Sequence, residues 1–316
     1  MLHYKNLNKL FFESYPQNAT DFIALSGFLG PDPIIKLEEL PLKSTIIYGL
    51  QKEKTKGQLH QQLHQQLINL HNDKIKIFYP DIACHSKCYL WLDGDKPIKG
   101  LIGSANFSSN GLFNDYRETL FEVDMNQLYM MHGYIKIILD SSKECNTVQI
   151  ATIAETKGLS RKDICEMILY DPKTRQTQMR HGLNWGFAEA NVTPNDACVP
   201  IRVEHIRKYP ELFPPLQPDP DNNGKTLKEV VEYMWDDGVV MQGRLEGSQS
   251  LNESNFRFPK QLASYPKKNE LGIYIRKRMN IPLGKRILIE DLERYGRDII
   301  AVSTLEDGVY YLDFSV

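Results

Sequence analysis

The sequence predicts a two-domain protein in which an α/β sandwich, a mixed sheet flanked by helices, is followed by a mainly β domain. In the first half, buried-type strand runs alternate with helical patterns, which is typical of an α/β sandwich. In the second half, short apolar runs are separated by turn signals, which favours a small β-barrel or pseudobarrel. A chain of 316 residues with 41% hydrophobic residues is long enough for two domains that each have a core.

The elements expected in the first half follow one another in a regular order. Asp21 to Leu29 (DFIALSGFL) and Ser44 to Leu50 (STIIYGL) are buried-type strand runs. The segment from Gln58 to Asn72 carries leucines at helical spacing, which indicates core packing. The remaining elements are a strand at Lys74 to Tyr79, a hairpin, a strand at Thr119 to Val123 and a helix near Gln127 to Ser141.

The hairpin carries the candidate site. Cys84 to Leu92 (CHSKCYLWL) and Lys99 to Ser104 (KGLIGS) favour strands, and Asp93 to Pro97 would form the turn between them. Residues two apart on a strand share a face, so polar side chains at alternate positions of the two strands are expected to converge. These side chains belong to His85, Lys87, Ser104 and Asn106.

An imidazole, an ammonium group, an amide and a hydroxyl together suit a phosphate group. The imidazole can attack phosphorus, while the other groups hold the non-bridging oxygens as negative charge develops. Gly103 would let the backbone approach closely. Two other interpretations stay open. His85 could be an ordinary strand histidine beside a GSAN turn, or Cys84, His85 and Cys88 could begin a zinc site, although no second ligand pair follows.

A polar stretch from Lys143 to Ser160 places the domain boundary near residue 150. We expect the first domain at residues 1–150, a linker at 151–170 with a bridging helix at Arg161 to Tyr170, and the second domain at 171–316. The apolar runs of the second domain are Ala197 to Val203, Gly238 to Leu245, Arg286 to Ile289, Asp298 to Val302 and Gly308 to Phe314. Between them lie a Pro-rich segment, Pro210 to Asp221, and the turn signal Asp221 to Gly224.

Composition places the chain among globular proteins. No run of roughly eighteen apolar residues occurs, and the start (MLHYKNLNKLFF) lacks the pattern of a signal peptide. We therefore expect a soluble, cytoplasmic protein that does not enter a membrane. The five cysteines are scattered and odd in number, which fits reduced thiols better than a disulfide framework.

The net charge of −2 gives no global basic field, but the arginines are unevenly distributed. Arg117 is the only arginine before residue 151, whereas twelve arginines follow. Arginine suits bidentate contacts to phosphates and guanine edges, whereas lysine acts as a point charge. Recognition is therefore expected in the second half of the chain.

The segments HSK and GSAN, in this order and at this separation, resemble the His-x-Lys…Gly-Ser-x-Asn signature of the phospholipase D superfamily. The resemblance implies a nucleophilic His85 and a reaction without a metal ion or other cofactor. Family nucleases carry a Glu beyond the Asn that orients the histidine, which implies Glu118, with Glu122 as the fallback. The family also has an Asp after the Lys; that position is Leu92 here, and the nearest Asp is Asp93.

The stretch ELGIYIRKRMNIPLGKRILIEDLERYGR, with GVYYLDFS at the end, resembles the C-terminal part of restriction endonucleases of the NgoFVII kind. That family joins a phospholipase-D-type nuclease domain to a DNA-reading pseudobarrel like that of plant auxin-response transcription factors. Two arms of the pseudobarrel enter the major groove, which implies arms at Arg180 to Asn195 and Gln242 to Lys260. The implied DNA-binding residues are Arg180, Asn184, Trp185, Asn191, Arg244, Gln249, Asn252, Asn255, Arg257 and Lys260.

Together the motif and the resemblances predict a metal-independent, site-specific endonuclease that cleaves double-stranded DNA. Covalent catalysis by a histidine needs a second group to protonate the leaving oxygen, and the motif occurs once, so we expect a homodimer that shares one site. The resemblance also admits a helper ATPase subunit and a cognate DNA methyltransferase as partners. The alternatives are a DNA-binding protein with an inactive nuclease-like domain, and a phospholipase or other phosphodiesterase.

Overall fold

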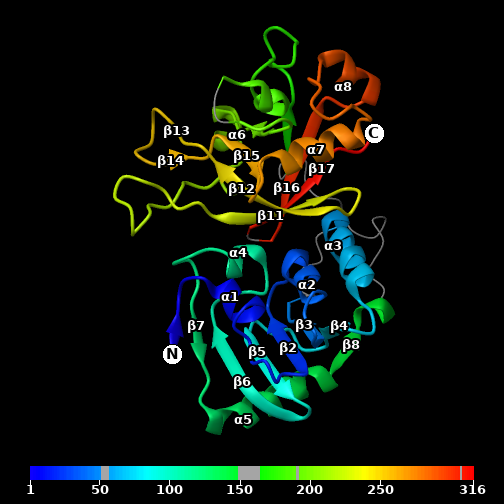
Figure 1. Cartoon of the computed structure of the whole chain (residues 1–316), viewed down its shortest axis with the longest axis vertical. Coiled ribbons are helices and arrows are strands. Elements are labelled where there is room, and N and C mark those ends of the chain that lie inside the picture. The colour runs from blue at the N-terminus through cyan, green and yellow to red at the C-terminus, as the bar shows by residue number, and fades with distance from the viewer. Residues whose placement is uncertain (51–56, 149–163, 190–191, 307) are drawn as a thin grey trace. The chain divides into compact units, whose positions relative to one another are not determined.

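The computed structural model describes residues 1–50, 57–148, 164–189, 192–306 and 308–316. The chain divides into two compact units (Figure 1). Unit 1 comprises Met1–Leu159 and Leu305–Val309, and unit 2 comprises Ser160–Thr304 and Tyr310–Val316. Each unit is built around its own sheet.

The sheet of unit 1 is mixed and has eight strands in the order β1-β7-β6-β5-β2-β3-β4-β8. Strands β2, β3 and β4 run parallel, and every other neighbouring pair is antiparallel. Leu25 pairs with Cys88, so the end of β2 lies beside the start of β5. The strands are β1 Leu2–His3, β2 Asp21–Ser26, β3 Lys43–Tyr48, β4 Ile75–Pro80, β5 Cys88–Asp93, β6 Lys96–Gly103, β7 Leu120–Glu122 and β8 Ser142–Glu144.

Helices cover both faces of this sheet, because its central strands are apolar on both sides. The buried side of α5 (Met125–Asp140) packs with Leu90 and Leu92 of β5. The alternate residue of β5, Trp91, faces Phe11 of α1 on the opposite side. The other helices of unit 1 are α1 Leu7–Phe12, α2 Pro31–Leu37, α3 Gly57–Leu70, α4 Ser109–Leu112 and the 3-10 turn η2 Cys145–Thr147.

The predicted α/β sandwich is confirmed, and the central hairpin forms as β5 and β6. Its turn is shorter than expected, because Asp93 already pairs with Lys96. Strand β5 begins only at Cys88, so His85 and Lys87 lie in the segment before the strand rather than on it.

Unit 2 contains a seven-stranded sheet in the order β10-β15-β12-β11-β17-β16-β9. Val199 of β10 and Met167 of β9 come from opposite ends of this order, yet both belong to one core cluster. The sheet therefore wraps around a single core as a nearly closed pseudobarrel, as predicted. The strands are β9 Cys165–Ile168, β10 Val199–Pro200, β11 Val230–Trp235, β12 Val240–Glu246, β15 Gln261–Ser264, β16 Ile299–Glu306 and β17 Val309–Asp313, with a separate pair β13 Gln249–Ser250 and β14 Arg257–Phe258.

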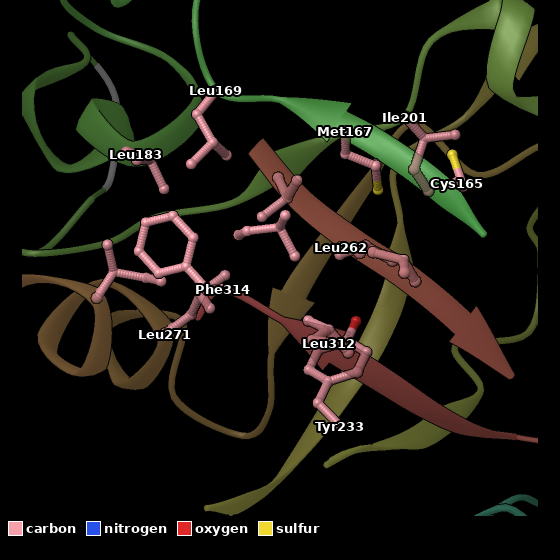
Figure 2. Packing of buried hydrophobic residues seen from close by; sticks show 14 of the residues in the cluster. Cys165, Met167, Leu169, Leu183, Ile201, Tyr233, Leu262, Leu271, Leu312 and Phe314 are labelled. Carbon is pink, nitrogen blue, oxygen red and sulfur yellow. The ribbon is translucent and has the colours of Figure 1, made fainter. Parts of the chain in front are cut away.

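Three helices close the core of unit 2. Leu271 of α7 belongs to the same core cluster as Phe314, Tyr233, Leu183 and Leu169 (Figure 2). The helices are α6 Val203–Lys208, α7 Asn269–Arg278 and α8 Ile289–Tyr295, with a 3-10 segment η4 at Gly182–Phe187.

Two predicted elements of the second half are wrong. The bridging helix at Arg161 to Tyr170 is contradicted because Cys165–Ile168 form β9, which pairs with β16. Residues 161–163 of that prediction lie outside the described residues. The predicted strand at Arg286 to Ile289 is absent, because Ile287 exchanges two backbone hydrogen bonds with the side chain of Asn184 and Ile289 begins α8.

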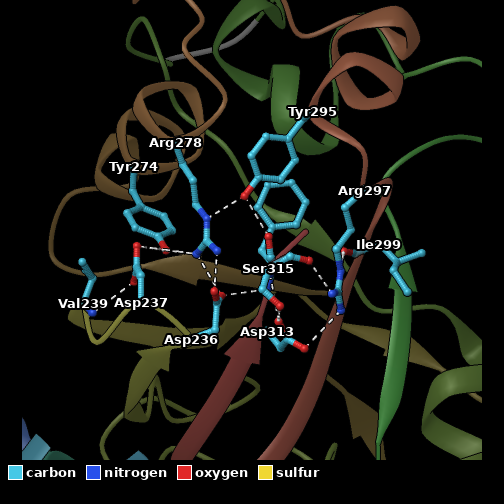
Figure 3. Close-up of polar contacts among 11 residues, drawn as sticks. Asp236, Asp237, Val239, Tyr274, Arg278, Tyr295, Arg297, Ile299, Asp313 and Ser315 are labelled. Carbon is cyan, nitrogen blue, oxygen red and sulfur yellow. Dashed lines mark hydrogen bonds and ion pairs between the residues drawn. The ribbon is translucent and has the colours of Figure 1, made fainter.

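A polar network ties α7 and α8 to the end of β11 (Figure 3). Arg278 of α7 forms an ion pair with Asp236 and donates hydrogen bonds to the hydroxyls of Tyr274 (2.6 Å) and Tyr295 (2.8 Å). Asp236 also accepts from the backbone N–H of Phe314 (2.8 Å). Burial lowers the pKa of Arg278, but its bonds to Asp236 and the two tyrosines raise it above the ordinary value. The network therefore fastens the last core residue of unit 2 to two helices.

All five cysteines are free and buried, which confirms the prediction of reduced thiols. Among the residues described, none of the helices combines the length and the apolar character needed to cross a bilayer.

Candidate active site and DNA-binding surface

The segment from Cys84 to Lys87 lies across the edge of the sheet where β3 ends. The backbone N–H of Cys84 donates to Gly49 O (2.9 Å), and that of Gly103 donates to Lys87 O (3.3 Å). A Cβ at Gly49 would stand 1.9 Å from the carbonyl oxygen of Cys84. Only glycine at position 49 therefore allows the segment to lie this close to the backbone.

His85 and Lys87 come together over Gly27, the residue that follows β2. A Cβ at Gly27 would stand 2.5 Å from His85 Cδ2 and 3.3 Å from both His85 Nε2 and Lys87 Nζ. The absence of a side chain at Gly27 leaves the space in which the imidazole and the ammonium group meet. Lys87 Nζ also donates to His85 O (2.8 Å), and the ring of Phe28 lies edge-on to the imidazole at 5.6 Å.

The two groups differ in exposure. His85 is exposed, whereas Lys87 is buried. Burial lowers the pKa of Lys87, and the carboxylate of Glu118 and the thiol of Cys84 partly raise it again. An ammonium group withdrawn from water interacts more strongly with a nearby anion than an exposed one does. The pair therefore offers an accessible imidazole next to a poorly hydrated positive charge.

Asn106 joins this site through the turn after β2. Its Oδ1 accepts a hydrogen bond from the backbone N–H of Phe28 (3.2 Å), and the hydroxyl of Ser26 lies 3.5 Å away. Because these contacts occupy Oδ1, the Nδ2 group is the end of the amide that can donate to a substrate oxygen. Ser26 Oγ also accepts from Phe107 N (2.9 Å), which fixes the GSAN turn to the end of β2.

Ser104 is exposed, and its hydroxyl accepts a hydrogen bond from the backbone N–H of Thr119 (3.0 Å). The backbone N–H of Ser104 donates to Thr119 O at the same distance of 3.0 Å. Ser104 therefore holds the chain next to Glu118 in place.

The three carboxylates considered for the site have different surroundings. Glu118 lies near Lys87, whose pKa it raises, but no hydrogen bond joins Glu118 to His85 in the described structure. Glu122 bonds to His3 Nε2 (3.3 Å) at the β1 edge, which disfavours it as the fallback. Asp93 ends β5 and binds Asn18 Nδ2 (3.2 Å), so it lies at the far end of the strand from Lys87.

The sequence reasoning missed Gly27, Ser26 and Phe28, which hold the two motif segments together. A usable signal was present, because binding sites in open α/β sheets form beyond the carboxyl ends of parallel strands. The Ser-Gly pair that interrupts the run Asp21 to Leu29 marks such an end.

Arg244 is the DNA-binding candidate with the most distinctive surroundings. It lies in the middle of β12, opposite Val230 of β11 and Ala263 of β15. Its guanidinium carbon stands 3.5 Å from the centre of the Tyr265 ring, and its Nε is buried without a hydrogen-bond partner. Burial lowers the pKa of Arg244, while Tyr265 and Glu246 raise it. The guanidinium is thus fixed as a flat, stacked group with unsatisfied donor capacity.

Arg244 lines a groove of about 350 Å³. Lys268, on the same groove, forms an ion pair with Glu246 (3.3 Å) and lies over the ring of Trp185 at 4.7 Å. Lys268 therefore connects the predicted first arm with β12. Sequence reasoning missed Lys268, Lys228 and Tyr265, because single lysines and tyrosines carry no local signal. The other lining residues are Leu216, Thr226, Leu227, Leu245, Gly247 and Ser248.

The predicted second arm corresponds mainly to the hairpin β13–β14. Arg257 donates to Ser248 Oγ and Ser250 Oγ, both at 2.7 Å, so its guanidinium braces the hairpin. Gln249 Nε2 donates to Ile201 O and Pro259 O, both at 2.8 Å. Its amide nitrogen therefore holds the backbone in place. The exposed candidates of this arm are Asn252, Asn255, Arg257 and Lys260.

In the predicted first arm, Asn184 is buried and its amide bonds to Gln178 O and to the backbone of Ile287. An amide with both ends occupied inside the core cannot reach a base, so the prediction for Asn184 is wrong. Arg180 is exposed and paired with Glu189, and Trp185 is half-buried. The prediction for Asn191 lies outside the described residues.

Comparison with known proteins adds to this geometry. Residues 5–152 match the NgoFVII restriction endonuclease N-terminal PLD domain, and residues 161–306 match the NgoFVII C-terminal B3-like DNA-binding domain. No curated protein matches.

Two solved structures are similar to part of the chain. NucT from Helicobacter pylori is 17% identical, with a TM-score of 0.30, over 40% of this chain and 82% of that chain. The polyphosphate kinase from Porphyromonas gingivalis is 14% identical, with a TM-score of 0.30, over 45% of this chain and 22% of that chain. Because the two domain models of one family match in sequence order and span nearly all of the chain, the protein belongs to the NgoFVII restriction endonucleases and is a DNA endonuclease with a phospholipase-D-type nuclease domain and a B3-like DNA-binding domain.

Proposed function

We propose that His85 attacks the phosphorus of a DNA phosphodiester and forms a covalent phosphohistidine. The observation that carries this proposal is the convergence of His85 Nε2 and Lys87 Nζ over Gly27. An exposed imidazole can reach the substrate, and the buried ammonium group beside it can stabilise the charge that develops on the non-bridging oxygens.

The reaction proceeds in two balanced steps. In the first, His85 Nε2 forms a bond to phosphorus while the bond from phosphorus to the leaving sugar oxygen breaks, and that oxygen takes up a proton. In the second, water gives up a proton and attacks phosphorus, and the phosphorus–nitrogen bond breaks. One DNA end then carries the phosphate and the other a hydroxyl, and the imidazole is restored.

Lys87 and Asn106 Nδ2 hold the non-bridging phosphate oxygens in both steps. Glu118 favours the charged form of Lys87, so we assign its carboxylate to the lysine rather than to the histidine. Ser104 fixes the chain beside Glu118 through Thr119. These groups supply the charge stabilisation that Mg²⁺ supplies in metal-dependent nucleases, so the proposed reaction uses no metal ion.

The proton that reaches the leaving oxygen comes from a second histidine, His85 of the partner subunit. His-x-Lys occurs twice in the chain, as His3-Tyr4-Lys5 and His85-Ser86-Lys87, but only the second is followed by Gly-Ser-x-Asn at the separation of the motif. A histidine titrates near neutral pH, as a group that gives and then takes a proton must. A two-fold axis beside the site would place the two exposed imidazoles on opposite sides of one phosphate. The proposed working nuclease is therefore a homodimer with one shared site.

Sequence reading belongs to the second domain. We place the nuclease domain at about residues 1–150 and begin the reading domain no later than Cys165, because β9 is part of the seven-stranded sheet. The proposed partner is double-stranded DNA in the cytoplasm. A helper ATPase subunit and a cognate DNA methyltransferase would complete a restriction–modification system.

The test compares His85→Ala with Asp93→Ala in the full-length protein, in buffer that contains excess EDTA. We expect His85→Ala to abolish cleavage of plasmid DNA while it keeps specific binding, because cutting and reading use different domains. Asp93→Ala should cleave at the rate of the unaltered protein. Cleavage by His85→Ala, or a requirement for added Mg²⁺ in the unaltered protein, would contradict the proposal.

A further inference from the structure

The side chains of the segment from Cys84 to Lys87 alternate between two environments. The reacting side chains face Gly27, whereas Ser86 and Cys84 face α5. The hydroxyl of Tyr134 on α5 lies 2.7 Å from Ser86 Oγ and 3.1 Å from Cys84 Sγ. Because neighbouring residues of an extended chain point to opposite sides, one side of the segment carries the chemistry and the other is attached to a helix.

Helix α5 makes Tyr134 a firm attachment point. Its residues Leu128, Met131, Ile135 and Ile138 are buried against the sheet, which fixes the helix in place. Tyr134 itself is 38% exposed, and burial of the remainder raises the pKa of its hydroxyl. The hydroxyl therefore stays protonated well above neutral pH and is available as a hydrogen-bond donor or acceptor.

The segment has few other attachments. Residues 83–87 belong to no helix or strand. In the part of the chain that the structure describes, the backbone N–H groups of His85 and Ser86 make no hydrogen bond to other backbone groups. Backbone bonds lie at Cys84 and Lys87, and His85 O accepts from Lys87 Nζ (2.8 Å). The hydroxyl of Ser86 is thus the attachment nearest to the imidazole on the helix side.

We propose that Tyr134 is a positioning residue of the nuclease: by holding Ser86, it sets where the imidazole of His85 stands over Gly27. The proposal rests on the role of His85 as nucleophile. Tyr134 acts through Ser86 and touches neither the phosphate nor the reacting nitrogen. A nucleophile displaced by about 1 Å from its attack geometry can lose about 100-fold in rate.

The experiment compares Tyr134→Phe with Tyr129→Phe. Tyr129 is on the same helix and 60% exposed, so the control removes a hydroxyl that does not contact the segment. In single-turnover cleavage at saturating DNA, Tyr134→Phe should be about 10- to 100-fold slower than Tyr129→Phe. The DNA dissociation constant and the unfolding temperature should be equal in the two variants. Equal cleavage rates would overturn the proposal.

A second readout reports on the imidazole without cleavage. In protein labelled with ¹⁵N-histidine, the ring signals of His85 are those missing from the His85→Ala spectrum. They should shift or broaden in Tyr134→Phe and stay unchanged in Tyr129→Phe. If cleavage survives in His85→Ala, the proposed function is wrong. If the His85 signals are the same in Tyr134→Phe as in the unaltered protein, only the positioning role of Tyr134 is wrong.

Ser86 gives an independent variant should Tyr134→Phe fold poorly. Ser86→Ala breaks the same hydrogen bond from the other side and should show the same slowing. The double variant should be no slower than Tyr134→Phe alone, because Tyr134→Phe already removes the contact with Ser86. Ser86→Thr keeps the hydroxyl and should restore most of the rate. Additive losses, or no rescue by threonine, would contradict a role through this contact.

Discussion

At the scale of single residues, the site depends on two glycines as much as on the groups that react. Gly49 admits the carbonyl of Cys84, and Gly27 admits the side chains of His85 and Lys87. Neither glycine has a positive φ, so close approach, rather than an unusual backbone conformation, is what requires them. Any side chain at position 27 would occupy the space in which the imidazole stands.

Gly27→Ala should therefore lower cleavage at least about 100-fold, because the new Cβ would stand 2.5 Å from His85 Cδ2 and push the imidazole aside. The imidazole is the end of a flexible exposed side chain, so the unfolding temperature should change little. Gly133→Ala is the matched control, since Gly133 lies in α5 and a Cβ there would have nothing within 4 Å. It should keep full activity and gain up to about 1 kcal/mol in stability. An active Gly27→Ala enzyme would show that the imidazole works from another position.

At the scale of elements, β12 presents Arg244 from the middle of a sheet rather than from a loop. The neighbouring strands β11 and β15 fix its backbone, and Tyr265 fixes the plane of its guanidinium. A group held in this way loses little conformational entropy when it binds, which is an advantage for discriminating between bases.

Arg244→Ala should weaken binding to the recognition site by about 1–3 kcal/mol if the guanidinium contacts a guanine edge. Arg244→Lys should lose most of the same discrimination, because lysine keeps the charge but not the planar fork. Arg294→Ala serves as control, since that arginine is 62% exposed on α8 and paired with Asp291. Titrations with the specific duplex and with a random duplex give the dissociation constants of all three variants. An equal loss on both duplexes would identify a phosphate contact instead.

The elements predicted correctly are those whose period is readable over several residues. The leucines of α3 and the buried runs of β2 and β3 are of this kind, and the β5–β6 hairpin follows from its turn residues. Strand β9 was mistaken for a helix because its four residues are too few to show a period. Its partner β16 lies more than a hundred residues later, and no local pattern records that pairing.

The candidate site divides in the same way. His85, Lys87, Ser104 and Asn106 could be predicted because short segments carry them. The effects of Gly27 and Tyr134 arise only when distant strands and helices meet. Asn184 shows the converse, because a side chain suited to base recognition is equally suited to capping buried backbone groups.

At the scale of the whole molecule, two units with separate sheets allow cutting and reading to be altered independently. In the proposed homodimer, activity also depends on association, because the site would be complete only when two chains meet. Inactive chains should therefore disable active ones.

Mixing His85→Ala chains in excess with unaltered chains tests this dependence, provided that subunits exchange and DNA is in excess. Cleavage should fall roughly as the square of the unaltered fraction, because only pairs of intact chains carry two histidines. Asp93→Ala chains mixed in the same ratio should leave the rate unchanged. A linear fall, or a monomer that cleaves at full rate, would rule out a shared site.

Four of the five buried cysteines should react slowly with electrophiles while the chain is folded. Cys84 is the exception, because burial is outweighed by its hydrogen bonds with Ser86 and Tyr134 and by the charge of Lys87, which lower its pKa. Cys84, Cys88 and Cys145 belong to unit 1, and Cys165 and Cys198 to unit 2. Burial raises the pKa of Cys88 and Cys145 to about 11 and that of Cys165 and Cys198 to about 12, so little thiolate forms before the chain opens. The alkylation rate of each of these four cysteines, followed by mass spectrometry, would then report how fast the unit that contains it opens. If added duplex DNA slows the alkylation of Cys165 and Cys198 alone, the DNA stabilises unit 2 and not unit 1.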